Sequence, residues 1–385
     1  MYSAKINHLF VVGISHRSAP LEEREKFHLS EAQVLSLLRE FRARGICSIF
    51  PLVTCNRVEI YSGEAIPGEV VSVLCNMTGN KPEVFYNFGY ILQGELVVEH
   101  LFHVAVGLDS RLTGDAQITG QIRQARKQAL AAGMRLRPEL NRLIEAAVAA
   151  GKKIRSETGY NTGAHSLSHA AIRYLKTNHI LKKHSRVLLV GTGKMGRLAL
   201  KSLLKEVPAS NITLINRRRE KAAALAAEFG LHTQQYTQLR QAVSAADIIL
   251  VATAACEPLF TAASLSNIAL YNKTFVDLSV PRNVEPGLPA TVVDIDQIGL
   301  CHAEEQQSYI RHAQRIISET VREYQDWLKR YELAQTITAE LHSSIFDNHL
   351  DKDTPEVSSR FLEKITFNHL RHFQKVKQSS YLVSG

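Results

Sequence analysis

A single cysteine stands in a polar step between two apolar stretches of the chain. In LVTCNRVEIY (52–61), Cys55 follows Thr54 and precedes Asn56 and Arg57. A cysteine thiolate attacks acyl groups when it is partly exposed and nearby positive charge favours the ionised form. Arg57 could supply that charge, or bind a substrate carboxylate through its planar guanidinium. On spacing alone, a nucleophile and a buried filler are both open for Cys55.

A glycine-rich turn lies further along the chain. VGTGKMG (190–196) fits G-x-G-x-x-G, follows the apolar stretch RVLLV and opens a helical stretch, which is the context that a dinucleotide site requires. The first glycine permits the tight turn, the second lets the backbone approach a pyrophosphate, and the third allows close helix–strand packing. The residues expected to contact the cofactor here are Gly191, Thr192, Gly193, Lys194, Met195 and Gly196.

The end of the following strand indicates which cofactor is bound. NAD-dependent enzymes usually place Asp or Glu about 20 residues beyond the glycines, where it holds the ribose 2′-hydroxyl. This chain has Asn216, Arg217, Arg218 and Arg219 instead. Arginines form charge-assisted bonds with a 2′-phosphate. We therefore predict NADPH, with Asn216, Arg217 and Arg218 at its ribose, and expect one of the three arginines to be solvated.

Three regions position these residues. Residues 1–155 alternate strand and helix signals and then turn helical, which predicts an α+β domain followed by helices. Residues 156–300 alternate apolar strands with helices, which predicts a parallel, doubly wound, Rossmann-like sheet. Residues 301–385 carry almost no strand signal and predict a long helix, a break at Pro355 and a shorter helix. The fold class expected is a multidomain α/β protein.

Composition restricts the partners. The chain has 385 residues, 45% hydrophobic, which suits two or three soluble domains. No apolar run reaches the roughly 18–20 residues of a membrane span, and the N-terminus lacks a signal peptide, so we expect a cytoplasmic protein without a membrane partner. The five cysteines form no CxxC, which argues against disulfides and a metal site. The net charge of +9 permits an anionic partner such as nucleic acid.

Several stretches, in the same order, resemble those of the glutamyl-tRNA reductase family. They are GISHRSAPLEEREKF (13–27), LVTCNRVEIY (52–61), HLFHVAVGLDSRLTGDAQITGQIRQA (100–125), VGTGKMG (190–196) and VDLSVPRNVEP (276–286). The resemblance covers about 10–300 and extends weakly into the helical tail. It implies NADPH-dependent reduction of glutamyl-tRNA(Glu) to glutamate-1-semialdehyde through a cysteine thioester, with release of tRNA, as the first step of tetrapyrrole synthesis.

The resemblance also implies roles for individual residues. Cys55 would be the nucleophile, and His100 a proton donor or oxyanion stabiliser. The substrate-binding positions would be Thr54, Asn56, Arg57, Ser110, Asp115, Ala116, Gln117 and Gln121. Residues 1–155 become the catalytic domain, 156–300 the NADPH-binding domain, and 301–385 a helical dimerisation domain joined by a long spinal helix. A homodimer is expected, as is a transient complex with glutamate-1-semialdehyde aminomutase, because the aldehyde product is reactive.

The chain departs from the family pattern at a few positions. Asp115 stands where the family usually has Glu, Arg111 and Thr113 replace residues that are usually apolar, and Val53 stands where Ser is common. Two alternatives therefore stay open. One is another NADP-dependent dehydrogenase, of shikimate-dehydrogenase-like type, acting on a free metabolite. The other is a tRNA-binding paralogue without catalytic activity.

Overall fold

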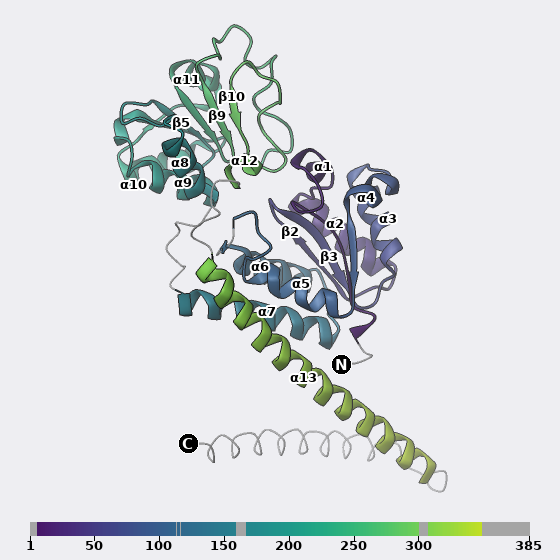
Figure 1. Cartoon of the computed structure of the whole chain (residues 1–385). Coiled ribbons are helices and arrows are strands. Elements are labelled where there is room, and N and C mark those ends of the chain that lie inside the picture. The colour runs from purple at the N-terminus through teal and green to yellow at the C-terminus, as the bar shows by residue number, and fades with distance from the viewer. Residues whose placement is uncertain (1–5, 113, 116, 159–166, 300–306, 349–385) are drawn as a thin grey trace. The chain divides into compact units, whose positions relative to one another are not determined.

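The computed structural model describes residues 6–112, 114–115, 117–158, 167–299 and 307–348 of the chain. The chain divides into two units, Met1–Tyr324 and Gln325–Gly385. The larger unit contains two sheets, and the long helix α13 begins in it and continues into the smaller unit. The elements are labelled in Figure 1.

The first sheet has four antiparallel strands in the order β2-β3-β1-β4. The strands are β1 (Phe10–Ser15), β2 (Ile49–Val53), β3 (Arg57–Ser62) and β4 (Tyr90–Gln93). Side chains alternate between the two faces of a strand, so Arg57, Glu59 and Tyr61 share one face of β3. All six residues of β3 are buried. The strand that follows the cysteine step therefore carries a polar face into the interior of the protein.

Seven helices accompany this sheet among the described residues. They are α1 (Leu21–Lys26), α2 (Glu31–Ala43), α3 (Pro67–Thr78), α4 (Pro82–Phe88), α5 (Glu95–Ala105), α6 (Gln117–Ala131) and α7 (Pro138–Thr158). Helix α6 packs against β2 and α7 (Figure 1). A Cβ at Gly151 of α7 would lie 2.5 Å from the carbonyl oxygen of Ala105 and from Oγ1 of Thr119. Only a glycine lets α7 approach α5 and α6 so closely.

The second sheet has six parallel strands in the order β10-β9-β8-β5-β6-β7. Its strands are β5 (Val187–Val190), β6 (Ile212–Ile215), β7 (His232–Thr233), β8 (Ile248–Val251), β9 (Thr274–Asp277) and β10 (Thr291–Val293). Its α-helices are α8 (Leu167–Thr177), α9 (Lys194–Leu203), α10 (Arg219–Phe229), α11 (Leu239–Ala245) and α12 (Ile295–Gly299). The strand order is that of a doubly wound dinucleotide fold, with β5 at the point where the order reverses. The predicted Rossmann-like sheet is confirmed.

The last described element is the long helix α13 (Gln307–Asn348), which confirms the predicted long helix. Within the larger unit, the Tyr324 hydroxyl donates to the Glu139 carbonyl at 2.9 Å, and Lys153 pairs with Glu319 at 2.6 Å. In the C-terminal unit, Trp327 stacks on Tyr331 with ring centroids 5.0 Å apart. Pro355 and the helix expected after it lie outside the described residues. Within the described ranges, no helix has both the length and the apolar character that a bilayer crossing needs.

The predicted α/β fold class is confirmed, with one omission in the first sheet. The sequence indicated β1, β2 and β3 but not β4. That strand has only four residues, is partly exposed and lies at the sheet edge. Edge strands of this length carry too little alternation to be distinguished from a loop.

Candidate active site

Cys55 lies in the tight turn that joins β2 to β3. The Thr54 hydroxyl accepts the backbone N–H groups of Asn56 and Arg57 at 3.1 and 3.2 Å, and the Thr54 N–H donates to the Arg57 carbonyl at 2.8 Å. The N–H of His16 binds the Asn56 carbonyl at 2.9 Å. A side chain that bonds to its own turn holds the backbone in one conformation. The cysteine is thus placed by two paired strands and a closed turn.

The environment of the Cys55 sulfur favours the neutral thiol. Burial raises the pKa of the Cys55 thiol to about 12, and the Asp115 carboxylate adds to this rise. The positive charges of Arg24 and Arg57 lower the pKa, but by less. The sequence suggested that Arg57 could supply positive charge to Cys55. Arg57 does so, but in the protein without substrate the desolvation of the sulfur outweighs both arginines.

The Arg57 side chain is fully buried and is held by protein acceptors. Its Nη1 donates to Oε1 of Glu59 at 2.7 Å and to Oδ2 of Asp109 at 2.9 Å, and its Nη2 donates to the Asp109 carbonyl. Its Nε is buried and has no hydrogen-bond partner among the described residues. A substrate carboxylate could therefore meet Nε and the second proton of Nη2 without exchanging an existing bond. Substrate binding by Arg57 stays a prediction.

His100, on α5, joins the same network. Its Nε2 lies 2.8 Å from Oε1 of Glu59, and its Nδ1 lies 3.8 Å from Oδ2 of Asp109. Burial alone raises the pKa of Glu59, but Arg57 and His100 lower it well below its usual range. Glu59 is therefore ionised at neutral pH and accepts the Nε2 proton of His100. The tyrosines Tyr61 and Tyr90 also donate to Glu59, at 2.6 and 2.5 Å.

Three members of this network have the ligand atoms of a metal site. Ligand atoms of Glu59, His100 and Asp109 lie within 4.8 Å of one another. The Arg57 guanidinium already bonds to both carboxylates of the group. A metal cation would have to displace a buried positive charge that satisfies the same oxygens. The arrangement therefore fits a guanidinium and not a metal ion.

The loop between α5 and α6 carries the next predicted site residues. Gly107 adopts φ +78°, and a Cβ there would lie 2.9 Å from the Asp115 nitrogen, so the loop folds tightly on itself. Ser110 is buried, and its Oγ has no partner among the described residues. The Asp115 side chain accepts the N–H of Gln117 at 2.9 Å, at the start of α6. Gln117 and Gln121 lie one turn apart and are half-buried, and Ala116 lies outside the described residues.

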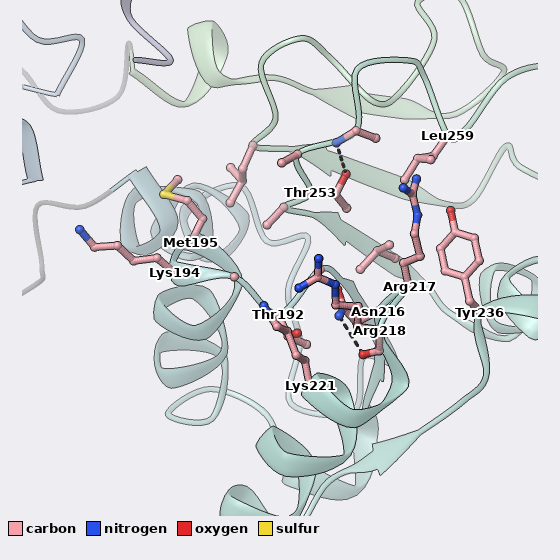
Figure 2. Close-up of a pocket in the computed structure, with 17 residues that line it drawn as sticks. Thr192, Lys194, Met195, Asn216, Arg217, Arg218, Lys221, Tyr236, Thr253 and Leu259 are labelled. Carbon is pink, nitrogen blue, oxygen red and sulfur yellow. Dashed lines mark hydrogen bonds between the residues drawn. The ribbon is translucent and has the colours of Figure 1, made fainter. Parts of the chain in front are cut away.

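The predicted cofactor residues line a cavity of about 490 Å³ at the carboxyl end of the parallel strands (Figure 2). Those that line it are Gly191, Thr192, Gly193, Lys194, Met195, Asn216, Arg217 and Arg218. Gly196 lies behind the turn, where a Cβ would be 2.1 Å from the Gly191 carbonyl oxygen. Gly191 adopts φ +98°, whereas a Cβ at Gly193 would meet nothing within 4 Å. The three glycines thus match the turn, approach and packing positions of a dinucleotide site.

The structure adds residues that the sequence analysis did not single out. Lys221 and Tyr236 also line the cavity, as do Leu259 and the segment 252–255 after β8. Figure 2 shows Tyr236 and Leu259 beside Arg217. Lys221 lies in the first turn of α10, and no spacing in the sequence singled it out. Arg217, Arg218 and Arg219 are all exposed, and Arg219 is not among the residues that line the cavity.

Glu59, Asp109 and Tyr90 were also missed in the first domain. Glu59 could have been suspected, because an acidic residue alternates with Arg57 and Tyr61 in an otherwise apolar strand. Asp109 and Tyr90 carry no such signal, since they reach the network from a loop and from the short strand β4.

The fold and the two sites define an oxidoreductase that combines a nicotinamide-dinucleotide domain with a separate domain bearing a cysteine turn. Residues 12–158 match the family model for the Glutamyl-tRNAGlu reductase N-terminal domain, and residues 175–300 match the Shikimate / quinate 5-dehydrogenase model. The chain belongs to the glutamyl-tRNA reductase family. The resemblance noted in the sequence is therefore confirmed.

Curated relatives match almost the whole chain. The glutamyl-tRNA reductase of Christiangramia forsetii is 31% identical over 95% of this chain and 92% of its own length. Glutamyl-tRNA reductase 2 of Flavobacterium johnsoniae is 34% identical over 96% of this chain and 89% of its own. The Synechococcus sp. glutamyl-tRNA reductase is 32% identical over 92% and 86%.

Proposed function

We propose that this protein reduces glutamyl-tRNA(Glu) to glutamate-1-semialdehyde with NADPH, through a thioester on Cys55. One observation carries the proposal: the chain combines two sites. The first is a cysteine turn beside the buried Arg57 network. The second is a dinucleotide cavity lined by three cations, Arg217, Arg218 and Lys221. The family and its curated relatives supply the substrate class. This reaction is the first step of tetrapyrrole synthesis from glutamate.

The first half of the reaction transfers the glutamyl group. The Cys55 sulfur attacks the ester carbonyl, the bond to the tRNA ribose oxygen breaks, and that oxygen takes up a proton. Because the pKa of Cys55 is about 12 in the free protein, the thiol must lose its proton as the substrate binds. Substrate that displaces the negative charge of Asp115, or moves it away from the sulfur, would lower this pKa. We assign His100 as proton donor or oxyanion stabiliser, with Glu59 holding its Nε2.

The second half is reductive. The cavity lined by Gly191, Gly193 and the arginines would hold NADPH, which would supply the hydride. As the thioester carbonyl carbon gains that hydride, its bond to sulfur would break, the aldehyde would leave, and the Cys55 sulfur would regain a proton. A thioester accepts hydride more readily than a carboxylate does. Forming the thioester on Cys55 therefore makes the reduction easier. The cations Arg217, Arg218 and Lys221 would hold the 2′-phosphate, and the unpartnered Oγ1 of Thr192 would donate to the pyrophosphate.

Buried polar atoms without partners support the assignment of the substrate-binding residues. Arg57 Nε and Ser110 Oγ are both buried and unpaired among the described residues, and Arg57 bonds to Asp109, the neighbour of Ser110. A buried polar atom without a partner costs free energy unless a ligand satisfies it. We therefore propose that Arg57 Nε and Ser110 Oγ bind the glutamyl group, together with Thr54, Asn56, Asp115, Ala116, Gln117 and Gln121.

A single-turnover assay with charged glutamyl-tRNA tests the proposal. The wild type should form a thioester on Cys55 and oxidise one NADPH for each aldehyde released, and Cys55→Ser should do neither. Normal turnover by Cys55→Ser would make the mechanism wrong.

We also propose a cytoplasmic homodimer that passes its aldehyde to an aminomutase. Size-exclusion chromatography with light scattering and a pull-down with the aminomutase test these two points.

A second candidate function is a tRNA-binding paralogue without turnover. The raised pKa of Cys55 and the presence of Asp115 favour it. It predicts that charged tRNA binds while NADPH is not consumed and no thioester appears. The same assay therefore separates the two functions.

A further inference from the structure

Helix α6 begins at the candidate active site and continues away from it. Its first residue, Gln117, donates its N–H to Asp115, and its 15 residues span about 22 Å at 1.5 Å per residue. Its apolar side chains Ile118, Ile122 and Ala129 are buried. The opposite face is solvent-accessible, and this face starts where the predicted substrate residues Gln117 and Gln121 lie.

The accessible face of α6 carries amides, cations and the exposed Leu130, and it has no acidic residue. Gln117, Gln121, Gln124 and Gln128 follow one another at intervals of four, three and four residues, so their side chains form one stripe along the helix. No Asp or Glu occurs between Asp115 and Glu139. A solvated helix face normally mixes both signs of charge. The complete absence of acidic residues therefore indicates a surface suited to an anion.

Cations without acidic partners border this stripe. Arg123 and Lys127 are exposed on α6, and Arg135 is exposed in the turn that follows it. None of the three forms an ion pair within the described ranges, whereas Arg126 on the same helix pairs with Glu145 at 2.7 Å. Arg42 of α2 adds a fourth cation, since a Cβ at Gly133 would lie 2.5 Å from its Nη1. Positive charge thus gathers toward the end of α6 that is distant from Cys55.

We infer that the exposed face of α6 is the track on which the acceptor strand of the tRNA lies. This inference rests on the proposed function and adds a location for the RNA. The amide stripe would hydrogen-bond riboses and phosphates near the ester, and Arg123, Lys127, Arg135 and Arg42 would neutralise phosphates further along the strand. Uncharged amides near the ester would not compete with the pocket for the glutamyl carboxylate. Cations at the other end of α6 would bind phosphates and so supply most of the affinity for tRNA.

The test compares two triple variants that remove the same charge. The track variant is Arg123→Gln, Lys127→Gln and Arg135→Gln. The control variant is Lys182→Gln, Lys183→Gln and Lys201→Gln, which alters exposed lysines of the dinucleotide domain. Each is assayed with glutamyl-tRNA and with 2′(3′)-O-glutamyl-adenosine, a minimal ester that has no phosphate. Tm and the Kd for NADPH confirm that both variants are folded.

The track variant should lose at least about tenfold in kcat/KM for glutamyl-tRNA, because charged hydrogen bonds are removed. The dependence of log Kd on log salt should become shallower by about 2, at roughly 0.7 per phosphate contact. Reduction of glutamyl-adenosine should not change. Equal behaviour of the track and control variants with glutamyl-tRNA would overturn the inference. Wild type that reduces neither ester would instead overturn the proposed function.

A single charge reversal gives an independent readout. Gln124→Glu places a carboxylate in the middle of the stripe and should weaken binding of uncharged tRNA, most strongly at low salt. Gln241→Glu, at an exposed position of α11, is the matched control. Unchanged tRNA affinity of Gln124→Glu at low salt would also overturn the inference.

Discussion

The Nη1 atom of Arg57 lies 2.7 Å from Oε1 of Glu59, and both side chains are completely buried. Arg57 is only two residues beyond the cysteine that we propose as the nucleophile, so the residue that shapes the site also belongs to the core of its domain. His100, Tyr61 and Tyr90 all converge on Glu59. Glu59 is therefore the acceptor that these four side chains share, while Asp109 is a second acidic partner of Arg57.

Replacement of the Glu59 carboxylate should cost both stability and activity. Glu59→Gln leaves the buried Arg57 guanidinium with Asp109 as its remaining acidic partner, and breaking a buried ion pair costs about 3–5 kcal/mol. We expect the free energy of unfolding, measured by denaturant titration, to fall by about 3 kcal/mol. Tyr61→Phe removes only one hydrogen bond to Glu59 and should cost about 1 kcal/mol. Equal losses in the two variants would contradict a central role for the charge.

The same carboxylate should make stability depend on pH. The pKa of Glu59 is lowered in the folded protein, so the folded state binds fewer protons there than the unfolded state. Its contribution is present above the unfolded pKa of about 4.3 and is lost as pH falls toward the folded value. Wild type should therefore lose stability between about pH 5 and 3 more steeply than Glu59→Gln. Parallel unfolding curves for the two proteins would refute this.

Alkylation of Cys55 should be slow at neutral pH. Because its pKa is about 12, the rate with iodoacetamide should keep rising up to high pH. Asp115→Asn removes a negative charge that raises this pKa and should speed alkylation several-fold at pH 8. Asp326→Asn, at an exposed position of α13, is the control. Peptide mass spectrometry measures Cys55 against the exposed Cys256 in the same sample.

Selectivity for the phosphorylated cofactor should depend on the cations that line the cavity. Arg217→Ala and Lys221→Ala should each weaken NADPH binding by about tenfold or more and leave NADH binding nearly unchanged, because only NADPH carries the 2′-phosphate. Arg219→Ala should affect neither cofactor, since Arg219 does not line the cavity. Fluorescence titration gives the Kd values. If Arg217→Ala weakened NADH and NADPH binding equally, Arg217 would not contact the 2′-phosphate of NADPH.

Two glycines of the same turn should respond differently to one added methyl group. In Gly193→Ala the new Cβ meets no atom within 4 Å, so Tm should not change while NADPH affinity falls. In Gly196→Ala the Cβ would lie 2.1 Å from a carbonyl oxygen, so the helix must shift and Tm should fall by several degrees. Scanning calorimetry and fluorescence titration separate the outcomes. A Gly193→Ala variant that binds NADPH normally would exclude close approach of the pyrophosphate.

The dinucleotide half of the molecule could be predicted from sequence because its signal is local. The strand, the turn and the helix that make the site occupy residues 187–203 without interruption, and each glycine has one steric reason to be there. The arginines follow the next strand, where the fold rule places a ribose contact.

The thiol half could be predicted only in part. Cys55 was singled out by its polar neighbours and His100 by the resemblance, but the network that surrounds them joins Arg57 to a residue 52 positions away. No periodicity reports such a contact. The sequence placed Arg57 beside Cys55 but did not reveal how strongly burial opposes ionisation of the thiol, because burial is a property of tertiary packing.

The buried position of Arg57 has a consequence for the recovery of mutants. A residue whose loss both unfolds the domain and disables the substrate pocket does not yield a stable, inactive protein. In a genetic screen for defective alleles, substitutions of Arg57 would appear as low abundance of the protein in the cell, cleared by proteases. Within the described part of the chain, the Cys55 side chain forms no ion pairs of the kind that Arg57 forms. Substitutions of Cys55 would therefore leave normal amounts of an inactive enzyme in the cell.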